Sequence, residues 1–106
     1  MSDLPRGVSI EPVWLVEVPY TAEAAERRAP LRPQHLRRMA RLIRDGVVME
    51  AGGATDFSKA VLLVRAASAE DAIALIEADV YTSGGVWHSP TAVGYGRVVP
   101  DDVERR

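Results

Sequence analysis

The sequence predicts a single α+β domain in which four strands form one antiparallel sheet and two helices cover one face of it. Three observations lead to this fold class. The chain has 106 residues, which is about the commonest size for one domain. Segments rich in β-branched residues and segments with helical spacing follow one another in the order β-α-β-β-α-β. With 47% hydrophobic and 26% charged residues, the composition is that of an ordinary globular domain.

The first predicted strand follows an irregular start of the chain. Residues 1–12 contain two prolines and a glycine without a sustained period, and residues 100–106 begin with a proline and are charged, so we expect both segments to be tails. The domain itself is then residues 13–99. Residues 13–20 are mostly β-branched and aromatic, which predicts a strand with both faces covered. Pro19 marks its end or an edge.

The first helix is predicted for residues 34–45, after a segment that Pro30 and Pro33 interrupt. Apolar side chains recur there at the i, i+3, i+4, i+7 spacing of one helix face, and arginines fill most other positions. The apolar positions are Leu36, Met39, Ala40 and Ile43. Pro33 suits the first turn, and Gly46 suits the left-handed position that ends a helix. We therefore expect His35 in the first helical turn.

Two more strands and a second helix follow. Residues 47–52 and 59–66 have strand character, and the short connection between them favours an antiparallel hairpin. Ser68 and Asp71 form an acidic variant of a capping box, which predicts a helix that runs to about Ala78. Its buried stripe is expected to consist of Ala69, Ala72, Ile73 and Ile76.

The end of the domain is predicted to be a turn and a last strand. Residues 79–85 have the composition of a turn-rich connection, and residues 86–99 that of a strand with Pro90 and Gly94 as points of interruption. The complete order of elements is that of the split βαβ, or ferredoxin-like, arrangement. In this arrangement both helices lie on a single face of the sheet.

The second face of the predicted sheet has no cover within the chain. Apolar residues occupy consecutive positions in residues 13–18 and 62–64, so both faces of these strands are hydrophobic. At roughly 25 cal/mol per Å², leaving several of these side chains in water would remove a large part of the stability of a small domain. We therefore expect an obligate homodimer whose sheets pack against each other.

Charge and cysteine content exclude several functional classes. The net charge of −2 provides no global field that attracts nucleic acid or anionic lipid. The absence of cysteine excludes disulfides, thiolate metal sites and a cysteine nucleophile. The sequence has no signal-peptide pattern and no apolar run of membrane-spanning length. We expect a cytoplasmic protein with no nucleic-acid or membrane partner.

Few residues are candidates for acid–base chemistry. His35 and His88 are the only side chains that ordinarily titrate near neutral pH. A structural role is the better starting interpretation for an isolated histidine, but the expected place of His35 at a helix start favours a neutral ring and hence a base. Asp79 follows the second helix directly, where a carboxylate is unfavourable unless it has a cationic partner. The spacing alone does not pair Asp79 with His35.

Arginines are concentrated around the first helix. Arg37, Arg38, Arg41 and Arg44 are expected on its solvent-exposed face. Arg32 lies about one turn before His35 and is the best candidate for a contact with a substrate anion.

The aromatic residues are candidates for the walls of a ligand pocket. Trp14, Tyr81 and Trp87 are expected in the core, in a dimer interface or around a planar organic ligand. The glycine pairs lack any nucleotide-binding pattern. Two histidines that are far apart in sequence, without cysteine, argue against a metal site. We expect no cofactor and a small-molecule ligand.

Taken in order, several short motifs resemble the YCII-related (YciI-like) family. That family has a His-Leu pair at the first helix, a glycine before an apolar strand, a Gly-Pro turn and a second apolar strand. A Ser-x-Glu-[Glu/Asp]-Ala helix start, an Asp-Pro-aromatic turn and a Gly-[Val/Leu]-aromatic strand follow. The corresponding segments here are His35-Leu36, Gly46-Val47-Val48, Gly52-Gly53, Ala60 to Val64, Ser68 to Ala72, Asp79-Val80-Tyr81 and Gly85-Val86-Trp87. The resemblance covers residues 13–99, with Gly53 and Val80 at the two family prolines.

The resemblance implies a dimeric α+β barrel in which His35 and Asp79 lie together in a cleft. It further implies that His35 is a general base or acid and that Asp79 orients the ring and stabilises its charge. We therefore expect a cofactor-independent lyase or isomerase that acts on a small, aromatic-derived metabolite. The substrate would contact Arg32 and be enclosed by Trp14, Tyr81 or Trp87, with His88 as a second acid.

Two other functions stay open. The protein could be a non-catalytic ligand-binding or accessory dimer, in which His35 and Asp79 form only a structural hydrogen bond. It could also be a cofactor-independent monooxygenase of the antibiotic-biosynthesis type, which shares the dimeric fold. A pocket that is closed by side chains would favour the ligand-binding or accessory dimer. Oxygen consumption with an aromatic polyketide would favour the monooxygenase.

Overall fold

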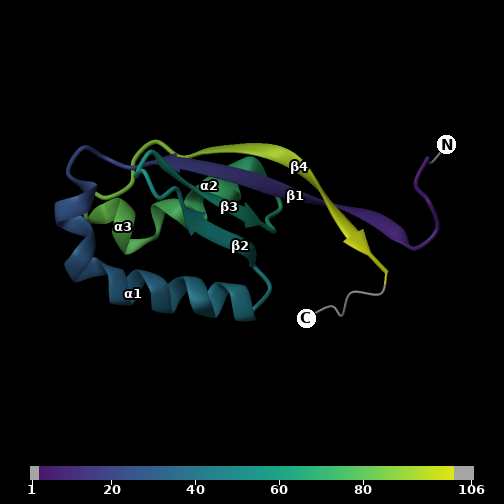
Figure 1. Cartoon of the computed structure of the whole chain (residues 1–106), viewed down its shortest axis with the longest axis horizontal. Helices are drawn as coiled ribbons and strands as arrows, with labels where there is room; N and C mark the ends of the chain where they lie inside the picture. Colours follow the sequence, from purple (N-terminus) through teal and green to yellow (C-terminus); the bar gives the residue numbers. More distant parts are fainter. Residues whose placement is uncertain (1–2, 102–106) are drawn as a thin grey trace.

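Four strands form one antiparallel sheet in the order β2-β3-β1-β4 in the computed structural model, which describes residues 3–101 (Figure 1). The strands are β1 (Val8–Pro19), β2 (Val48–Gly53), β3 (Lys59–Val64) and β4 (Thr91–Pro100). The helices are α1 (Ala24–Arg44), α2 (Ala69–Glu77) and α3 (Val80–Ser83). The element order and the central position of β1 and β3 confirm the predicted α+β class and its ferredoxin-like arrangement.

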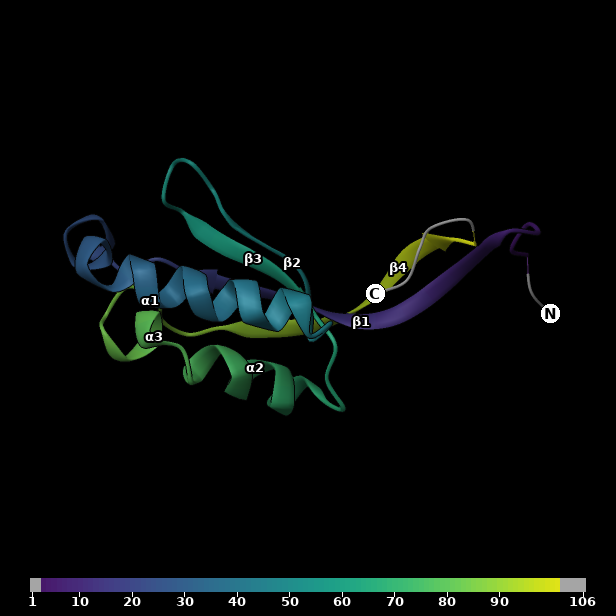
Figure 2. The ribbon, with the colours of Figure 1, turned by 90° about the horizontal axis from the view of Figure 1, so that it is seen from below.

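The helices lie together on one face of the sheet (Figure 2). Alternate residues of β1 and β3 face them, because successive side chains of a strand point to opposite sides. Val16 of β1 pairs in register with Leu62 of β3, and Val18 with Ala60. The core between sheet and helices also contains Met39, Val48, Val64, Ala72, Ile76, Tyr81 and Val86.

Helix α1 is longer than the predicted residues 34–45 because it begins at Ala24 and contains both Pro30 and Pro33. Each proline removes a backbone donor and clashes with the preceding turn, which bends a helix. Figure 1 shows the first turns of α1 at a steep angle to the rest. His35 therefore lies in the middle of α1, and the expectation that it occupies the first turn was wrong. The helix-dipole argument for a neutral His35 does not apply at this position.

Strand β1 begins at Val8, so residues 8–12 are not part of a tail. Val8 pairs with Pro100 and Val13 with Tyr95, whereas pairing between β1 and β3 begins only at Trp14. Residues 8–13 and 95–100 thus form a two-stranded arm that projects beyond the rest of the sheet (Figure 2). Pro12 is tolerated in this strand because β1 has only one neighbour there. Pro100, which was expected to begin the other tail, is the last residue of β4, and residues 102–106 lie outside the described residues.

The second half of the chain follows the prediction with one added helix and a later start of the last strand. The Ser68 hydroxyl accepts a hydrogen bond from the Asp71 N–H at 3.1 Å and begins α2, as expected. The turn-rich connection contains the short helix α3. Strand β4 begins at Thr91, so the expectation that residues 86–90 belong to the last strand was wrong; of these residues, Trp87 forms an isolated bridge with Tyr20. The strand continues through Gly94 without a break. No helix within residues 3–101 is long and apolar enough to cross a membrane.

Candidate active site

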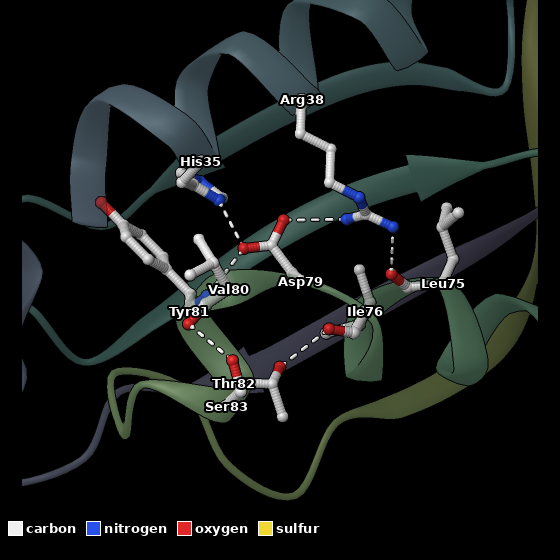
Figure 3. A network of polar contacts seen from close by, with 9 residues as sticks. All are labelled: His35, Arg38, Leu75, Ile76, Asp79, Val80, Tyr81, Thr82 and Ser83. Carbon is white, nitrogen blue, oxygen red and sulfur yellow. Dashed lines mark hydrogen bonds and ion pairs between the residues drawn. The ribbon is translucent and has the colours of Figure 1, made fainter.

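His35 and Asp79, which are 44 positions apart, form a hydrogen bond of 2.8 Å between Nδ1 and Oδ1 (Figure 3). His35 comes from α1, and Asp79 is the N-cap residue of α3. Both are buried, with exposed fractions of 7% and 1%. The structure therefore brings together the two residues that the family resemblance paired.

The Asp79 carboxylate accepts two further hydrogen bonds. The N–H of Tyr81 donates to Oδ1 at 2.9 Å, and Nη1 of Arg38 donates to Oδ2 at 2.8 Å. Burial raises the pKa of Asp79, but the hydrogen bonds from His35, the Tyr81 N–H and Arg38, together with the charge of a protonated His35, outweigh this effect. The pKa of Asp79 consequently lies below its usual value, and the carboxylate is ionised at neutral pH.

An ionised Asp79 determines which tautomer the neutral His35 ring adopts. A carboxylate can only accept, so Nδ1 of His35 must carry the hydrogen of their shared bond. Nε2 is then free to accept a proton. The ring is also fixed by its neighbours, because it stacks on Tyr81 at 3.7 Å between centroids and meets Trp87 edge-on at 4.9 Å.

Arg38 is a site residue that the sequence interpretation placed on the solvent-exposed face. Its side chain is 18% exposed, and its Nη2 donates to the Leu75 carbonyl at 2.8 Å (Figure 3). Leu75 lies in the last turn of α2, where helix carbonyls lack intrahelical partners and attract cations. Arg38 thus connects α1, the end of α2 and Asp79. Arg38 lies three residues after His35, and this spacing places both side chains on the same side of a helix. The spacing could therefore have identified Arg38 as a neighbour of the site.

A cavity of about 590 Å³ lies between α1 and the β2–β3 hairpin, and His35 is part of its wall. Arg32, Tyr81 and Trp87, three of the predicted substrate-binding residues, line the same cavity. The other lining residues from α1 are Arg28, Leu36, Met39, Ala40 and Ile43. Those from elsewhere are Tyr20, Ala51, Gly52, Gly53, Ala54, Thr55, Phe57, Ala60 and Leu62.

Two predicted substrate contacts lie outside this cavity. The indole Nε1 of Trp14 donates to the Ala66 carbonyl at 3.0 Å, and both residues line a different hollow near the arm. His88 is exposed, and its ring is 3.3 Å from the Ser89 hydroxyl. Within residues 3–101, no three histidine, aspartate or glutamate side chains gather as ligands for a metal ion.

Arg28, Tyr20 and Phe57 are cavity residues that the sequence interpretation did not select. The Arg28 guanidinium lies 4.6 Å from the Phe57 ring centroid, and Phe57 in turn contacts the Tyr20 ring at 5.5 Å. Phe57 comes from the β2–β3 connection, so only the folded hairpin places it against α1.

No protein-family model matches the sequence, and no curated protein matches it significantly. A histidine with a free Nε2, held by an ionised carboxylate and facing a cavity, can accept a proton and stabilise the resulting imidazolium.

Proposed function

We propose that this protein is a cofactor-independent lyase or isomerase, related to the YCII-related family, in which His35 removes a proton from a carbon next to a carbonyl group. One observation carries the proposal: the buried hydrogen bond of 2.8 Å between His35 and an ionised Asp79, on a ring that lines a cavity. The aromatic neighbours of the ring support it, because they restrict His35 to one orientation.

The proposed reaction has two proton-transfer steps. Nε2 of His35 takes the proton, and the electron pair of the broken C–H bond moves toward the substrate carbonyl to form an enolate. The imidazolium is stabilised by Asp79, which stays ionised because Arg38 and the Tyr81 N–H also donate to it. Return of the proton to another carbon gives an isomerase. Its transfer to a leaving group, which departs with its bonding electrons, gives a lyase.

Deuterium exchange tests the proposal without knowledge of the natural substrate. The protein is incubated in deuterated buffer with phenylpyruvate, 4-oxopentanoate or 2-oxo-4-phenylbutanoate, and incorporation next to the carbonyl is followed by NMR. We expect exchange above the buffer rate for at least one compound. His35→Asn should lower the catalysed rate by about 10²-fold or more, which is the usual contribution of a general base.

His88→Asn provides the matched control, because it makes the same change at an exposed histidine outside the cavity. We expect this variant to keep the wild-type rate. Exchange that is equal in His35→Asn and the wild type would contradict the proposal and favour a ligand-binding or accessory protein.

The proposed functional unit is a homodimer. In the described residues, no helix covers the sheet face opposite the helices, which we call the open face. It carries Val13, Leu15, Val61, Leu63, Val93 and Tyr95, which the strand register places on one side. Ion pairs flank this apolar strip, with Glu11 between Arg65 and Arg97 at one end and Glu17 with Lys59 at the other. An apolar centre with a charged rim is typical of protein interfaces.

A further inference from the structure

The cavity beside His35 changes from cationic to apolar along α1. Its residues from this helix follow the spacing of a single helix face, with Arg28 and Arg32 before His35 and the apolar Met39 and Ile43 after it. At about 1.5 Å per residue, His35 lies roughly 5 Å along the axis from Arg32 and 12 Å from Ile43. His35 is thus placed where the charged and apolar parts of the cavity meet.

Arg28 and Arg32 have no counterion among the residues that the structure describes. Neither Arg28 nor Arg32 forms an ion pair within residues 3–101, although Arg38 and other arginines in that range do. Arg28 packs on Phe57, which orients its guanidinium against the cavity wall. The charges of Arg28 and Arg32 both act on the Tyr81 hydroxyl and oppose the larger effect of burial, which raises the pKa of Tyr81. Arg28, Arg32 and Tyr81 all line the same cavity.

Tyr81 supplies a second, independent indication of a ligand. Its side chain is only 2% exposed and lines the cavity, yet its hydroxyl has no hydrogen-bond partner in the described part of the chain. Figure 3 shows the hydroxyl directed away from Asp79, on the side of α1. Because burial keeps the hydroxyl protonated at neutral pH, it is available as a donor. Within residues 3–101, the buried side-chain donor that lacks a partner is Nε1 of Trp87, which lines the same cavity. The Tyr81 hydroxyl is accessible to the solvent in the cavity, and a ligand oxygen there would replace water as its acceptor.

We propose that the Tyr81 hydroxyl, Arg28 and Arg32 form a subsite for the carboxylate of a small amphipathic substrate, whose apolar part lies along Met39 and Ile43. A carboxylate is a compact anion that can accept from guanidinium and hydroxyl groups together. The mainly apolar remainder of the cavity fits a ligand with one anionic end. This inference rests on the proposed function for the role of His35, which would then face the carbon atoms near the carboxylate.

Calorimetric titration of the full chain with paired probes tests the subsite. The probes are 2-naphthoate and octanoate, each compared with its neutral amide, and 2-naphthyl phosphate. We expect at least one carboxylate to bind about tenfold or more tightly than its amide. Arg28→Gln and Arg32→Gln should each weaken carboxylate binding by about tenfold and leave amide binding unchanged. Tyr81→Phe should weaken carboxylate binding by about tenfold and amide binding by less, because a neutral acceptor forms the weaker hydrogen bond. Arg37→Gln, at an exposed arginine of α1 outside the cavity, should bind like the wild type.

Three results would overturn the subsite: no binding of either carboxylate, equal affinities for carboxylate and amide, or unchanged carboxylate binding in all three cavity variants. Tighter binding of the naphthyl phosphate than of 2-naphthoate would show that the anion class is wrong. His35→Asn separates the subsite from the proposed function. If His35→Asn and the wild type bind the carboxylate alike and neither catalyses exchange, the subsite stands and the proton-transfer function fails.

Discussion

Asp79 receives hydrogen bonds from three groups that belong to two separate parts of the chain. His35 and Arg38 reach it from α1, and the Tyr81 N–H reaches it from the start of α3. One carboxylate therefore fixes the His35 tautomer, caps a helix and neutralises a partly buried arginine. The ionised Asp79 carboxylate therefore contributes both to the stability of the fold and to the ability of His35 to accept a proton.

The pH dependence of stability should reveal this link. Asp79→Asn should lower the free energy of unfolding by about 2 kcal/mol at neutral pH, because hydrogen bonds to a charged group are lost or weakened. Since the folded-state pKa of Asp79 lies below the unfolded value of 3.8, its contribution is complete above that value and is lost as the pH falls through the folded pKa. Urea unfolding of both proteins should show a smaller difference near pH 3 than near pH 5. An unchanged difference near pH 3 would show that the Asp79 charge is not responsible.

Part of the site could be predicted from the sequence. His35 and Asp79 were selected because few side chains titrate near neutral pH and because their motifs matched a family order, whereas their contact spans 44 positions and no local rule predicts it. Arg38 was wrongly expected on the solvent-exposed face. Helical periodicity shows which residues share a face of α1, but it does not show which other element packs against that face. Tyr81 was selected as an aromatic wall, but its unpartnered hydroxyl is visible only in the structure.

At the scale of elements, α1 holds most of the site on one face. The bend at Pro30 and Pro33 separates the turn that carries Arg28 from the straight part that carries His35 and Arg38. The sequence predicted a helix start next to Pro33, at residue 34, because proline is favoured at the beginning of a helix and disfavoured further inside. Packing against the rest of the domain overcame that preference. By contrast, the start of α2 was predictable, since the Ser68 cap is a purely local interaction.

The Ser68 cap supplies a prediction at this scale. Ser68→Ala removes the acceptor for the Asp71 N–H and should lower the free energy of unfolding by about 1 kcal/mol. Ser68→Asp, which also accepts at an N-cap position, should stay within a few tenths of a kcal/mol of the wild type. Chemical denaturation of the three proteins measures both effects. Equal losses in the two variants would show that packing of Ser68, and not capping, stabilises the start of α2.

At the scale of the whole molecule, the sheet has one face under the helices and one open face, and the arm extends beyond both. Val93 on the open face is 57% exposed. The arm is a two-stranded ribbon, and such ribbons are only marginally stable when isolated in water. Both features support the proposed homodimer. The uncovered face was predictable from consecutive apolar residues, but the arm was not, because Pro12 indicated an irregular tail.

The dimer is tested by sedimentation equilibrium. We expect the wild-type protein to have twice the mass of one chain at micromolar concentration. Val93→Asp should shift it toward the monomer, because a charge on the open face would be buried without a partner. Ala74→Asp, at an exposed position of α2 on the other side of the sheet, should remain dimeric. A wild-type monomer across the concentration range would contradict the proposed dimer.

In the proposed mechanism, Asp79 holds the His35 ring with the hydrogen on Nδ1 and leaves Nε2 free to accept a proton. Long-range ¹H–¹⁵N correlation spectra of the full chain at about pH 8 observe the two ring nitrogens directly, and His35→Asn identifies which signals belong to His35. The geometry predicts a protonated Nδ1 and an unprotonated Nε2 for His35. A His35 ring with the hydrogen on Nε2, or with both nitrogens protonated at that pH, would contradict its role as the base.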